Sequence, residues 1–285
     1  MTATDTVELE CSGASVGVAP GLGGAILWWR IDGADVLRPA PPAPEIRDTA
    51  CFALLPFANR IEHGRFEFDG AAVVLLPHPL AAPHALHGHG WEAGWRTERR
   101  AAAAIELAHD HRPDAWPWAY RATQRIHLAG DALEIELALT NLDPRRAMPG
   151  GAGIHPYFPR VANSRVVASA TRMWRNDATG LAIAEVDDNR FVGERAVPIG
   201  ALDGVDNCFA SAGPVVVEGG GRSISVSGAP ARGFHLYVPP GADHFCVEPV
   251  SHFPDSFGRG EWSETDRVAP GATRRWRYRL AVSNT

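Results

Sequence analysis

Short runs of apolar residues, each of strand length, recur along the chain and are separated by Gly, Pro, Asn and Asp. Leu133, Ile135 and Leu137 fall on one face of such a run, while Glu134 and Glu136 fall on the other. This period of two residues is typical of a half-buried β-strand. Runs of this kind predict strands at residues 7–10, 15–18, 25–30, 65–68, 105–109, 121–128, 133–139, 215–218, 223–227, 234–238 and 273–282.

The apolar stripe of a long helix is missing from the sequence. Residues 101–106 are rich in Ala, but this run is shorter than the ~12 residues that indicate a helix. Clusters of Pro, as at 39–44 and 113–117, and of Gly at 150–153 mark loops between strands. Because all-β folds often reach ~250 residues as one unit, we expect a mainly β protein with little helix and a single domain over residues 1–285.

The charge of the chain narrows the functions to consider. Lys and Arg number 27 and Asp and Glu 33, a net charge of −6, and the two signs are mixed along the chain. This pattern does not favour a partner such as nucleic acid or an anionic membrane. Every basic residue is Arg, which excludes Schiff-base chemistry through Lys.

The cysteines and the N-terminus indicate a cellular compartment. Cys11, Cys51, Cys208 and Cys246 are scattered, with no CxxC pair and no spacing typical of metal ligands. The first ten residues lack the basic and apolar regions of a signal peptide, and no apolar run reaches the ~18 residues of a membrane span. We therefore expect reduced thiols in a cytoplasmic protein.

Asn59 and Arg60 form the first candidate site, because they follow the apolar residues 51–55 in a region expected to be a loop. Catalytic and binding groups are often carried on loops that a rigid sheet positions. The planar guanidinium of Arg60 offers several donors that suit sugar hydroxyls. A structural ion pair or a solvated loop position is the alternative for Arg60.

The second candidate segment, residues 84–91, holds three His, two Gly and a Trp. His87 stands beside Gly88, which permits close approach of the backbone to a ligand, and Trp91 is suited to stacking on a sugar ring. Ordinary core packing is the alternative for Trp91. The His spacing invites a zinc assignment, but no HExxH motif, no Cys partner and no carboxylate at the spacing of a metal ligand accompanies it, so we expect no metal site.

His155 and Asp206 are weaker candidates when each is taken alone. His155 precedes Pro156, which favours an extended backbone and helps to aim the imidazole. A hydrogen-bonded His in the core is the alternative. Asp206 stands beside Asn207, and such residues also form turns for purely local reasons.

Glu248 is the strongest single candidate, because it ends an apolar, strand-like run at residues 245–248. Burial raises the pKa of a carboxyl group, which suits a general base. Burying a carboxylate without a function is costly unless an ion-pair partner accompanies it. We therefore interpret Glu248 as a functional residue.

Taken together and in order, five of these segments resemble the aldose 1-epimerase (galactose mutarotase) family. The matching segments are 58–61 (Ala-Asn-Arg-Ile), 86–88 (Leu-His-Gly), 155–158 (His-Pro-Tyr-Phe), 206–209 (Asp-Asn-Cys-Phe) and 248–249 (Glu-Pro). The resemblance implies the large antiparallel β-sandwich of this family, the galactose mutarotase-like supersandwich. It also implies an enzyme that interconverts the α and β anomers of a free aldose.

The resemblance assigns roles to residues of this sequence. It implies that Glu248 is the general base and His155 the general acid, while Arg60, His87 and Asp206 bind the sugar hydroxyls. Opening a cyclic hemiacetal needs one base at the anomeric hydroxyl and one acid at the ring oxygen, and a Glu and a His can supply both. No cofactor is expected, since the chain lacks dinucleotide, phosphate-loop and calcium-loop motifs.

The substrate stays open at this point. The expected partner is a monosaccharide bound by a monomer or homodimer. A branch of the family acts on hexose 6-phosphates, which need a cationic pocket, and the sequence offers candidates for it at Arg96, Arg99, Arg100, Arg172 and Arg175. Two further alternatives are a glycoside hydrolase that uses Asp206 and Glu248, and a sugar-binding module without catalysis.

Overall fold

Each of the predicted period-two runs forms a strand in the computed structural model, which describes residues 5–211 and 213–284. In β13 (Ala132–Asn141), the side chains of Leu133, Ile135 and Leu137 are buried, while Glu134 and Glu136 are partly exposed. The burial of alternate side chains therefore follows the pattern of the sequence and confirms the predicted strands.

The largest sheet has nine antiparallel strands, in the order β10-β11-β12-β13-β27-β23-β22-β17-β20. It is built largely from hairpins, since β10 to β13 pair in chain order. The C-terminal strand β27 then inserts between β13 and β23. The bounds are β10 (Arg96–Ala101), β11 (Ala104–His111), β12 (Tyr120–Ala129), β27 (Thr273–Asn284), β23 (Arg222–Ala229), β22 (Val215–Gly219), β17 (Arg165–Val167) and β20 (Val197–Pro198).

The second sheet has eight strands and carries most of the candidate residues. Its order is β19-β18-β21-β24-β25-β15-β5, and β16 also pairs with β25. The bounds are β19 (Ala182–Phe191), β18 (Ala170–Asn176), β21 (Asp206–Ala210), β24 (Gly233–Tyr237), β25 (His244–Val250), β15 (Gly153–Ile154), β5 (Ala53–Leu54) and β16 (Tyr157–Pro159). All of its pairings are antiparallel.

Smaller sheets and short helical turns complete the described part of the chain. A four-stranded sheet consists of β1 (Val7–Cys11), β2 (Ala14–Ala19), β3 (Ala25–Ile31) and β4 (Ala34–Asp35). Paired short strands are β6 (Arg60–Ile61) with β9 (Ala85–Leu86), β7 (Arg65–Phe68) with β8 (Ala71–Val74), and β14 (Met148–Pro149) with β26 (Arg267–Val268). The helical segments are 3₁₀ turns, η1 (Ile46–Asp48), η2 (Glu62–Gly64), η3 (Ile199–Leu202) and η4 (Glu264–Asp266).

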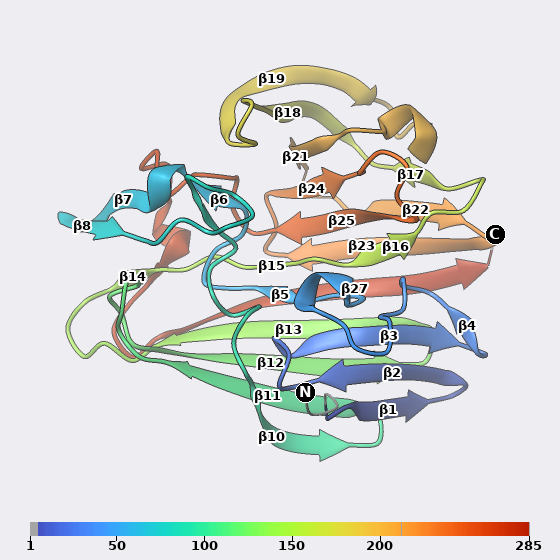
Figure 1. Ribbon diagram of the computed structural model, residues 1–285, viewed down its shortest axis with the longest axis horizontal. Helices are drawn as coiled ribbons and strands as arrows, with labels where there is room; N and C mark the ends of the chain where they lie inside the picture. Colours follow the sequence, from blue (N-terminus) through green and yellow to red (C-terminus); the bar gives the residue numbers. More distant parts are fainter. Residues whose placement is uncertain (1–4, 212, 285) are drawn as a thin grey trace.

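The two large sheets pack against each other through buried apolar side chains. Strand β23 of the nine-stranded sheet contacts β25 of the eight-stranded sheet. Gly228 permits this approach, since a β carbon there would lie 3.0 Å from the ring of Tyr278 and 3.3 Å from Pro249. Figure 1 shows the strands of both sheets running nearly side by side, with the β7–β8 pair at one end. This arrangement is the predicted antiparallel sandwich with little helix.

The buried apolar side chains of the described elements form two clusters, of which the smaller includes Phe52, Trp91 and Tyr157, and the larger spans most of the sheets. The larger cluster runs from Leu9 in β1 to Val282 in β27 and includes the large rings of Trp29, Trp116 and Trp276. Within the described residues no helix has the length and apolar character needed to cross a membrane.

Candidate active site

A cavity of about 430 Å³ lies over the eight-stranded sheet, and its size falls in the range of ligand pockets. Strands β21, β24 and β25 supply part of its lining, and the short strands β6 and β9 supply another part. The cavity brings together six of the residues that the sequence singled out, namely Asn59, Arg60, His87, His155, Asp206 and Glu248. These residues are far apart in the chain, so the fold assembles the site.

A larger hollow, of about 550 Å³, lies elsewhere, against β12, β13, β23 and β27. Partly exposed ion pairs line it, such as Arg277 with Glu136 and His127 with Glu134. None of the predicted site residues lines this hollow. The chemistry therefore points to the smaller cavity.

Glu248 and His155 lie side by side in the smaller cavity. His155 Nε2 is 3.2 Å from Glu248 Oε1, and the Glu248 side chain is only 2% exposed. Burial raises the pKa of Glu248 to about 8, an effect that the neighbouring His235 opposes. Burial lowers the pKa of His155 to about 3. At pH values between these two pKa values, the pair therefore holds one proton more than a Glu248 carboxylate beside a neutral His155 would.

Aromatic rings and one backbone bond fix the imidazole of His155. Its ring stacks against Phe52 at 4.7 Å and against Tyr157 at 4.8 Å, and these two rings also contact each other. Its backbone N–H donates to the carbonyl of Phe52. The Nδ1 atom is buried and has no hydrogen-bond partner among the described residues. Nε2 is thus the nitrogen that faces Glu248 in the cavity.

His87 is held as a neutral donor. Its Nδ1 accepts a hydrogen bond of 3.0 Å from the backbone N–H of Asn59, so the proton of the neutral ring lies on Nε2. Burial lowers the pKa of His87 well below its ordinary value, and the nearby His155 adds to this effect. Gly88 follows in a left-handed conformation with a φ of 67°, where a β carbon would clash with the carbonyl oxygen of Leu55.

Asn59 organises the loop that precedes β6. Its own φ is 62°, its carbonyl accepts the backbone N–H of His87, and its side-chain oxygen accepts the backbone N–H of Arg60 at 2.8 Å. Arg60 Nε is buried and unpartnered among the described residues. The guanidinium lies against Gly180, where a β carbon would be 2.8 Å from Cζ. This geometry leaves the Arg60 donors available to a ligand.

Asp206 pairs with a residue that sequence reasoning did not select, His235. Asp206 Oδ1 lies 2.6 Å from His235 Nε2, and the Asp206 side chain remains 39% exposed. Burial raises the pKa of Asp206, but the bond and the charge of His235 outweigh burial and lower it. The sequence contains a signal for His235, because alternation along β24 places it on the other face of the strand from the core residues Phe234 and Leu236.

Trp91, which the sequence suggested as a stacking surface, does not line the cavity. It is 2% exposed, packs edge-on against His87 at 5.8 Å, and donates its indole N–H to the carbonyl of Gly88. Trp91 therefore supports the segment that carries His87, as the core-packing alternative anticipated.

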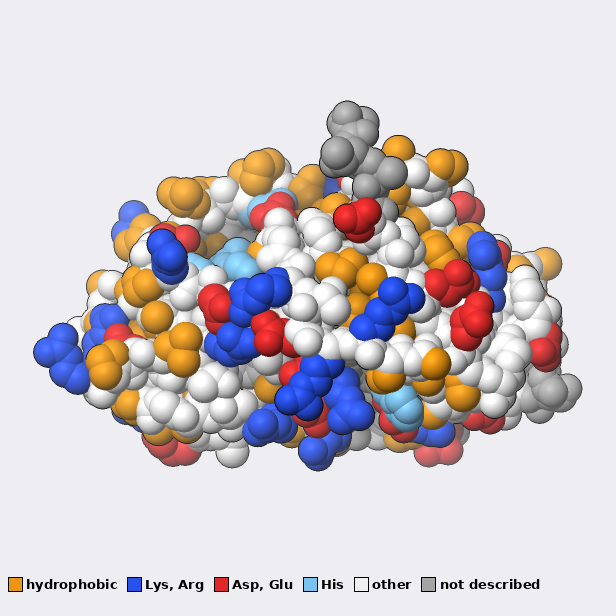
Figure 2. Space-filling model, turned by 90° about the horizontal axis from the view of Figure 1, so that it is seen from below, with side chains coloured by type: hydrophobic (Ala, Val, Ile, Leu, Met, Phe, Trp, Pro, Cys, Tyr) orange, Lys and Arg blue, Asp and Glu red, His pale blue; other side chains and the backbone are white. Residues whose placement is uncertain are grey.

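The cationic residues proposed for a phosphate also lie outside the cavity. Arg96, Arg99 and Arg100 are on β10, at an edge of the nine-stranded sheet, while Arg172 and Arg175 are on β18. Arg96 pairs with Glu98 and Asp110. Figure 2, viewed from the side of the molecule where β10 lies, shows basic and acidic side chains interspersed.

Other arginines line the cavity instead, and they stand in no local motif of the sequence. Arg38 stacks over the ring of Tyr157 at 4.5 Å and lies 2.9 Å from His244 Nδ1. Arg47, from η1, lines the cavity near Tyr237. In the described part of the chain, Arg38, Arg47 and Arg60 form no ion pair with a carboxylate.

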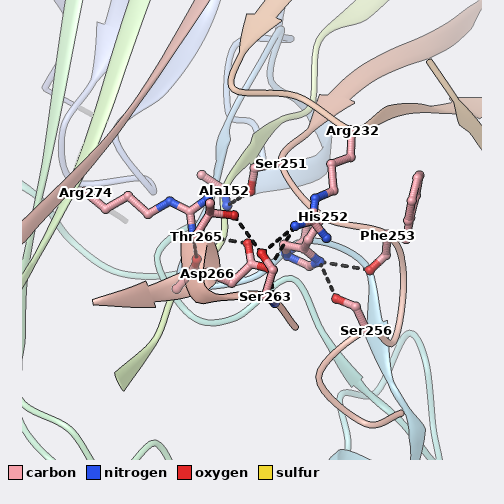
Figure 3. A network of polar contacts seen from close by, with 12 residues as sticks. Ala152, Arg232, Ser251, His252, Phe253, Ser256, Ser263, Thr265, Asp266 and Arg274 are labelled. Carbon is pink, nitrogen blue, oxygen red and sulfur yellow. Dashed lines mark hydrogen bonds and ion pairs between the residues drawn. The ribbon is translucent and has the colours of Figure 1, made fainter. Parts of the chain in front are cut away.

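Figure 3 shows a polar network that includes His252 and Asp266, and His252 also contacts the segment that leads to Asn59. His252 Nε2 accepts the backbone N–H of Ala58 at 3.0 Å, and His252 Nδ1 donates to the carbonyl of Phe253. Farther back, the fully buried Asp266 pairs with Arg274 at 3.1 Å. Because both nitrogens of His252 are engaged, its ring is neutral and its orientation is fixed.

One cluster in the described chain offers ligands of the kind that a metal binds. His155, Cys246 and Glu248 have ligand atoms within 4.8 Å of one another. Cys246, however, is fully buried and does not line the cavity, and burial raises the pKa of its thiol well above the ordinary value. Because metals bind the thiolate, this cluster supports no assignment of a metal site.

Comparisons with known proteins identify the family of the chain. The family model described as Aldose 1-epimerase matches residues 5–281. The uncharacterized protein YphB of Escherichia coli (strain K12) is 32% identical over 257 residues, which cover 86% of this chain and 87% of that protein. The crystal structure of a candidate aldose 1-epimerase from Escherichia coli K12 matches with a TM-score of 0.90 and 29% identity, covering 98% of this chain and 99% of that chain.

More distant structures share the fold. Galactose 1-epimerase from Lactobacillus acidophilus NCFM matches with a TM-score of 0.81 over 98% of this chain and 94% of that chain, at 15% identity. At this identity the likeness shows the fold alone, and it confirms the predicted galactose mutarotase-like sandwich. Because the family model spans nearly the whole sequence, this chain belongs to the aldose 1-epimerase family.

Proposed function

We propose that the protein is a mutarotase that interconverts the α and β anomers of a free aldose such as glucose, galactose or a pentose. The observation that carries this proposal is the buried pair of Glu248 and His155, with Nε2 and Oε1 3.2 Å apart in a cavity of about 430 Å³. The anomeric hydroxyl and the ring oxygen of a sugar are bonded to one carbon. A base and an acid that lie side by side suit this geometry.

The reaction needs only a redistribution of protons. With the single proton of the pair on His155, Glu248 accepts the proton of the anomeric hydroxyl while His155 Nε2 donates to the ring oxygen. The bond between C1 and the ring oxygen breaks, and an aldehyde forms. Rotation about the bond between C1 and C2 presents the other aldehyde face, and the same transfers in reverse close the opposite anomer.

In the free protein one member of the pair holds the shared proton. Since the pKa of Glu248 is raised to about 8 and that of His155 lowered to about 3, the proton rests on Glu248. Ring opening therefore starts after this proton has moved to His155 Nε2, which lies 3.2 Å from Glu248 Oε1. The proton that Glu248 then takes from the anomeric hydroxyl restores the resting arrangement. Each proton transfer contributes typically ~10² to 10⁴ in rate.

The remaining polar groups suit the hydroxyls of the sugar. His87 offers Nε2–H as a donor, and Arg60 offers guanidinium donors. Asp206 keeps an exposed part of its carboxylate as an acceptor. A ring with hydroxyls at several positions can use donors and acceptors of both kinds.

A sugar with an anionic substituent is the second candidate substrate. Arg38 and Arg47 line the same cavity, and within the described residues neither pairs with a carboxylate. A phosphate or carboxylate on the sugar would supply the missing anion. This observation favours testing the hexose 6-phosphates that the sequence left open.

Polarimetry tests the proposal. The optical rotation is followed over time, with and without the protein, for freshly dissolved α-D-glucose, α-D-galactose and α-D-xylose, and then for glucose 6-phosphate. We expect a faster approach to the same final rotation for at least one of them. Release of the aryl group from an aryl glycoside, without faster mutarotation, would instead favour the glycoside hydrolase that uses Asp206 and Glu248.

A further inference from the structure

The lining of the site cavity is mostly polar. Apart from histidines, its apolar and aromatic side chains within the described chain are those of Leu80, Leu86, Tyr157 and Tyr237. A sugar ring carries hydroxyls around its edge and C–H groups on its faces, so an aromatic ring suits one of these faces. Because Trp91 lies outside the cavity, the two tyrosines are the candidates for this contact.

The ring of Tyr157 is already engaged by the protein. His155 stacks on it with ring centroids 4.8 Å apart, and the guanidinium of Arg38 lies over it at 4.5 Å. His244 packs against the same ring at 5.3 Å. With these neighbours Tyr157 is only 5% exposed, so its ring supports His155 and offers little surface to a ligand.

Tyr237 lies on β24, between two strands that carry site residues. It is directly opposite Asp206 on β21 and Cys246 on β25. Residues opposite each other on adjacent antiparallel strands have β carbons about 4.5 to 5.5 Å apart. The alternation along β24 turns Leu236 to the apolar core and Tyr237 to the face that carries the cavity. Its ring therefore stands beside the Asp206 carboxylate.

The ring of Tyr237 remains available to a ligand. Tyr237 is partly exposed, and among the described residues no aromatic ring stacks on it and no guanidinium lies over it. The neighbouring Asp206 side chain is 39% exposed. A sugar hydroxyl that donates to Asp206 thus brings the adjacent C–H groups of the same ring to Tyr237.

We propose that Tyr237 is a specificity-determining residue of the site, whose ring packs against a C–H face of a pyranose while Asp206 accepts a hydroxyl of the same sugar. The kinetic part of this inference rests on the proposed function. It also narrows the substrate class to cyclic sugars with one face free of bulky substituents. The contact does not depend on turnover, so binding alone can reveal it.

Two substitutions separate the ring of Tyr237 from its hydroxyl. Tyr237→Phe keeps the aromatic ring and removes only the hydroxyl. Tyr237→Leu replaces the flat ring with a branched aliphatic chain. Phe253→Leu is the matched control, since Phe253 is also partly buried and packs against the same smaller apolar cluster but does not line the cavity.

We expect Tyr237→Leu to weaken binding and to leave the chemical step nearly unchanged. Its KM should rise about tenfold, because apolar contact surface and an aromatic contact are lost. Its kcat should stay within about threefold of wild type, since a contact made equally in the ground and transition states raises KM alone when lost. For Tyr237→Phe and Phe253→Leu, both constants should stay within about threefold. Equal rises of KM in Tyr237→Leu and Phe253→Leu would indicate general loosening and would overturn the proposal.

Intermolecular NOEs test the contact without turnover. The probes are 1,5-anhydro-D-glucitol and 1,5-anhydro-D-galactitol, pyranoses that lack the anomeric hydroxyl and cannot mutarotate. The chain has four Tyr, so the ring signals of protein labelled at Tyr can be assigned to Tyr237 through Tyr237→Phe. NOEs between this ring and the C–H protons of at least one bound probe support the proposal, even if no aldose is turned over.

The contrary results are separate from those for the proposed function. Binding of the probes without an NOE to Tyr237 overturns the proposal, even if polarimetry finds mutarotation. Failure of both probes to bind also overturns it, because the proposed contact does not need the anomeric hydroxyl. Should Tyr237→Leu fail to fold, the NOEs of the wild-type protein decide.

Discussion

At the scale of single residues, neighbours decide which proton each side chain holds. The backbone N–H of Asn59 fixes the proton of His87 on Nε2, and burial gives Glu248 a raised pKa beside a neutral His155. A side chain of Glu or His in water would have neither property. The chemistry of the site therefore lies in the placement of these groups as much as in their identity.

Glu248→Gln should separate activity from stability. Removing the base should lower kcat/KM by about 10² to 10⁴. The folded pKa of Glu248, about 8, lies above the ordinary value of 4.5, so the folded protein binds more protons between these values and loses stability as pH rises through this window. The variant lacks this loss. At pH 8.5 we expect its free energy of unfolding to exceed that of wild type by on the order of 2 kcal/mol.

Polarimetry and thermal melting at pH 5 and pH 8.5 check this prediction. The advantage of Glu248→Gln in Tm should be larger at the higher pH. A variant that turns over sugar at the wild-type rate would remove Glu248 from the mechanism. A variant that melts below wild type at both pH values would contradict the account of its burial.

Trp91→Phe should affect stability and leave ligand binding nearly unchanged, because Trp91 lies behind His87 and not in the cavity. Loss of the indole N–H bond to Gly88 and of buried surface should cost about 1 to 3 kcal/mol. KM should remain within about threefold of wild type. Trp95→Phe is a matched control, since Trp95 is also buried and donates to the carbonyl of Gly90. A tenfold rise in KM for Trp91→Phe alone would place Trp91 against the ligand.

The sequence could predict some of these residues and not others. Asn59, Arg60, His87, His155, Asp206 and Glu248 stand in local motifs, and the fold brings them to one cavity. His235 and Arg38 stand in no motif. Strand register places His235 in the cavity, and Arg38 contacts His244, which lies far along the chain. No local motif encodes either relation.

At the scale of elements, the segment that follows β25 clamps the segment that leads into β6. His252 accepts from the backbone N–H of Ala58, and Asp255 donates its backbone N–H to the carbonyl of Arg60 and accepts from the backbone N–H of Glu62. One connected stretch of chain therefore carries Glu248 and also positions Asn59 and Arg60. The catalytic and binding parts of the site are tied together by this clamp.

His252→Asn should loosen the clamp, because the shorter side chain leaves the buried N–H of Ala58 without its acceptor. An unsatisfied buried donor costs about 1 to 3 kcal/mol, and KM should rise about tenfold while the pH profile of kcat/KM keeps its wild-type position. Ser256→Ala is the control, since Ser256 contacts His252 Nδ1 and makes no bond to Ala58. Equal effects of both substitutions on KM would argue against the clamp, and thermal melts would report the stability of each.

At the scale of the whole molecule, the period-two pattern predicted the strands and the family resemblance implied the sandwich, but neither predicted the pairing of distant strands. Hairpins such as β12–β13 join neighbours in the sequence, so local patterns and turns define them. The insertion of β27 depends on pairing across long stretches of chain, since Ala132 pairs with Ala281 and Ala229 with Arg277. Strands β24 and β25, by contrast, are neighbours in the sequence, and their pairing sets His235 opposite Glu248.

The pH dependence of the whole protein follows from the pair. Below the raised pKa of Glu248, about 8, the pair holds the proton that the acid step needs, and above it the proton is lost. We expect kcat/KM to be level through neutral pH and to fall about tenfold per unit above pH 8, which reports the pair as a unit. Stopped-flow polarimetry from pH 5 to pH 10 measures this profile. A rate that keeps rising above pH 9 would mean that the pair needs no proton.

The central claim is that Glu248 and His155 exchange protons with the anomeric centre of a sugar. Exchange NMR at equilibrium tests it most directly, since cross-peaks between the α and β H1 signals report interconversion without any net reaction. With wild-type protein we expect cross-peaks for at least one aldose, free or 6-phosphorylated, and their loss with Glu248→Gln. Exchange no faster than in buffer for all of these sugars, with folded wild-type protein, would contradict the account.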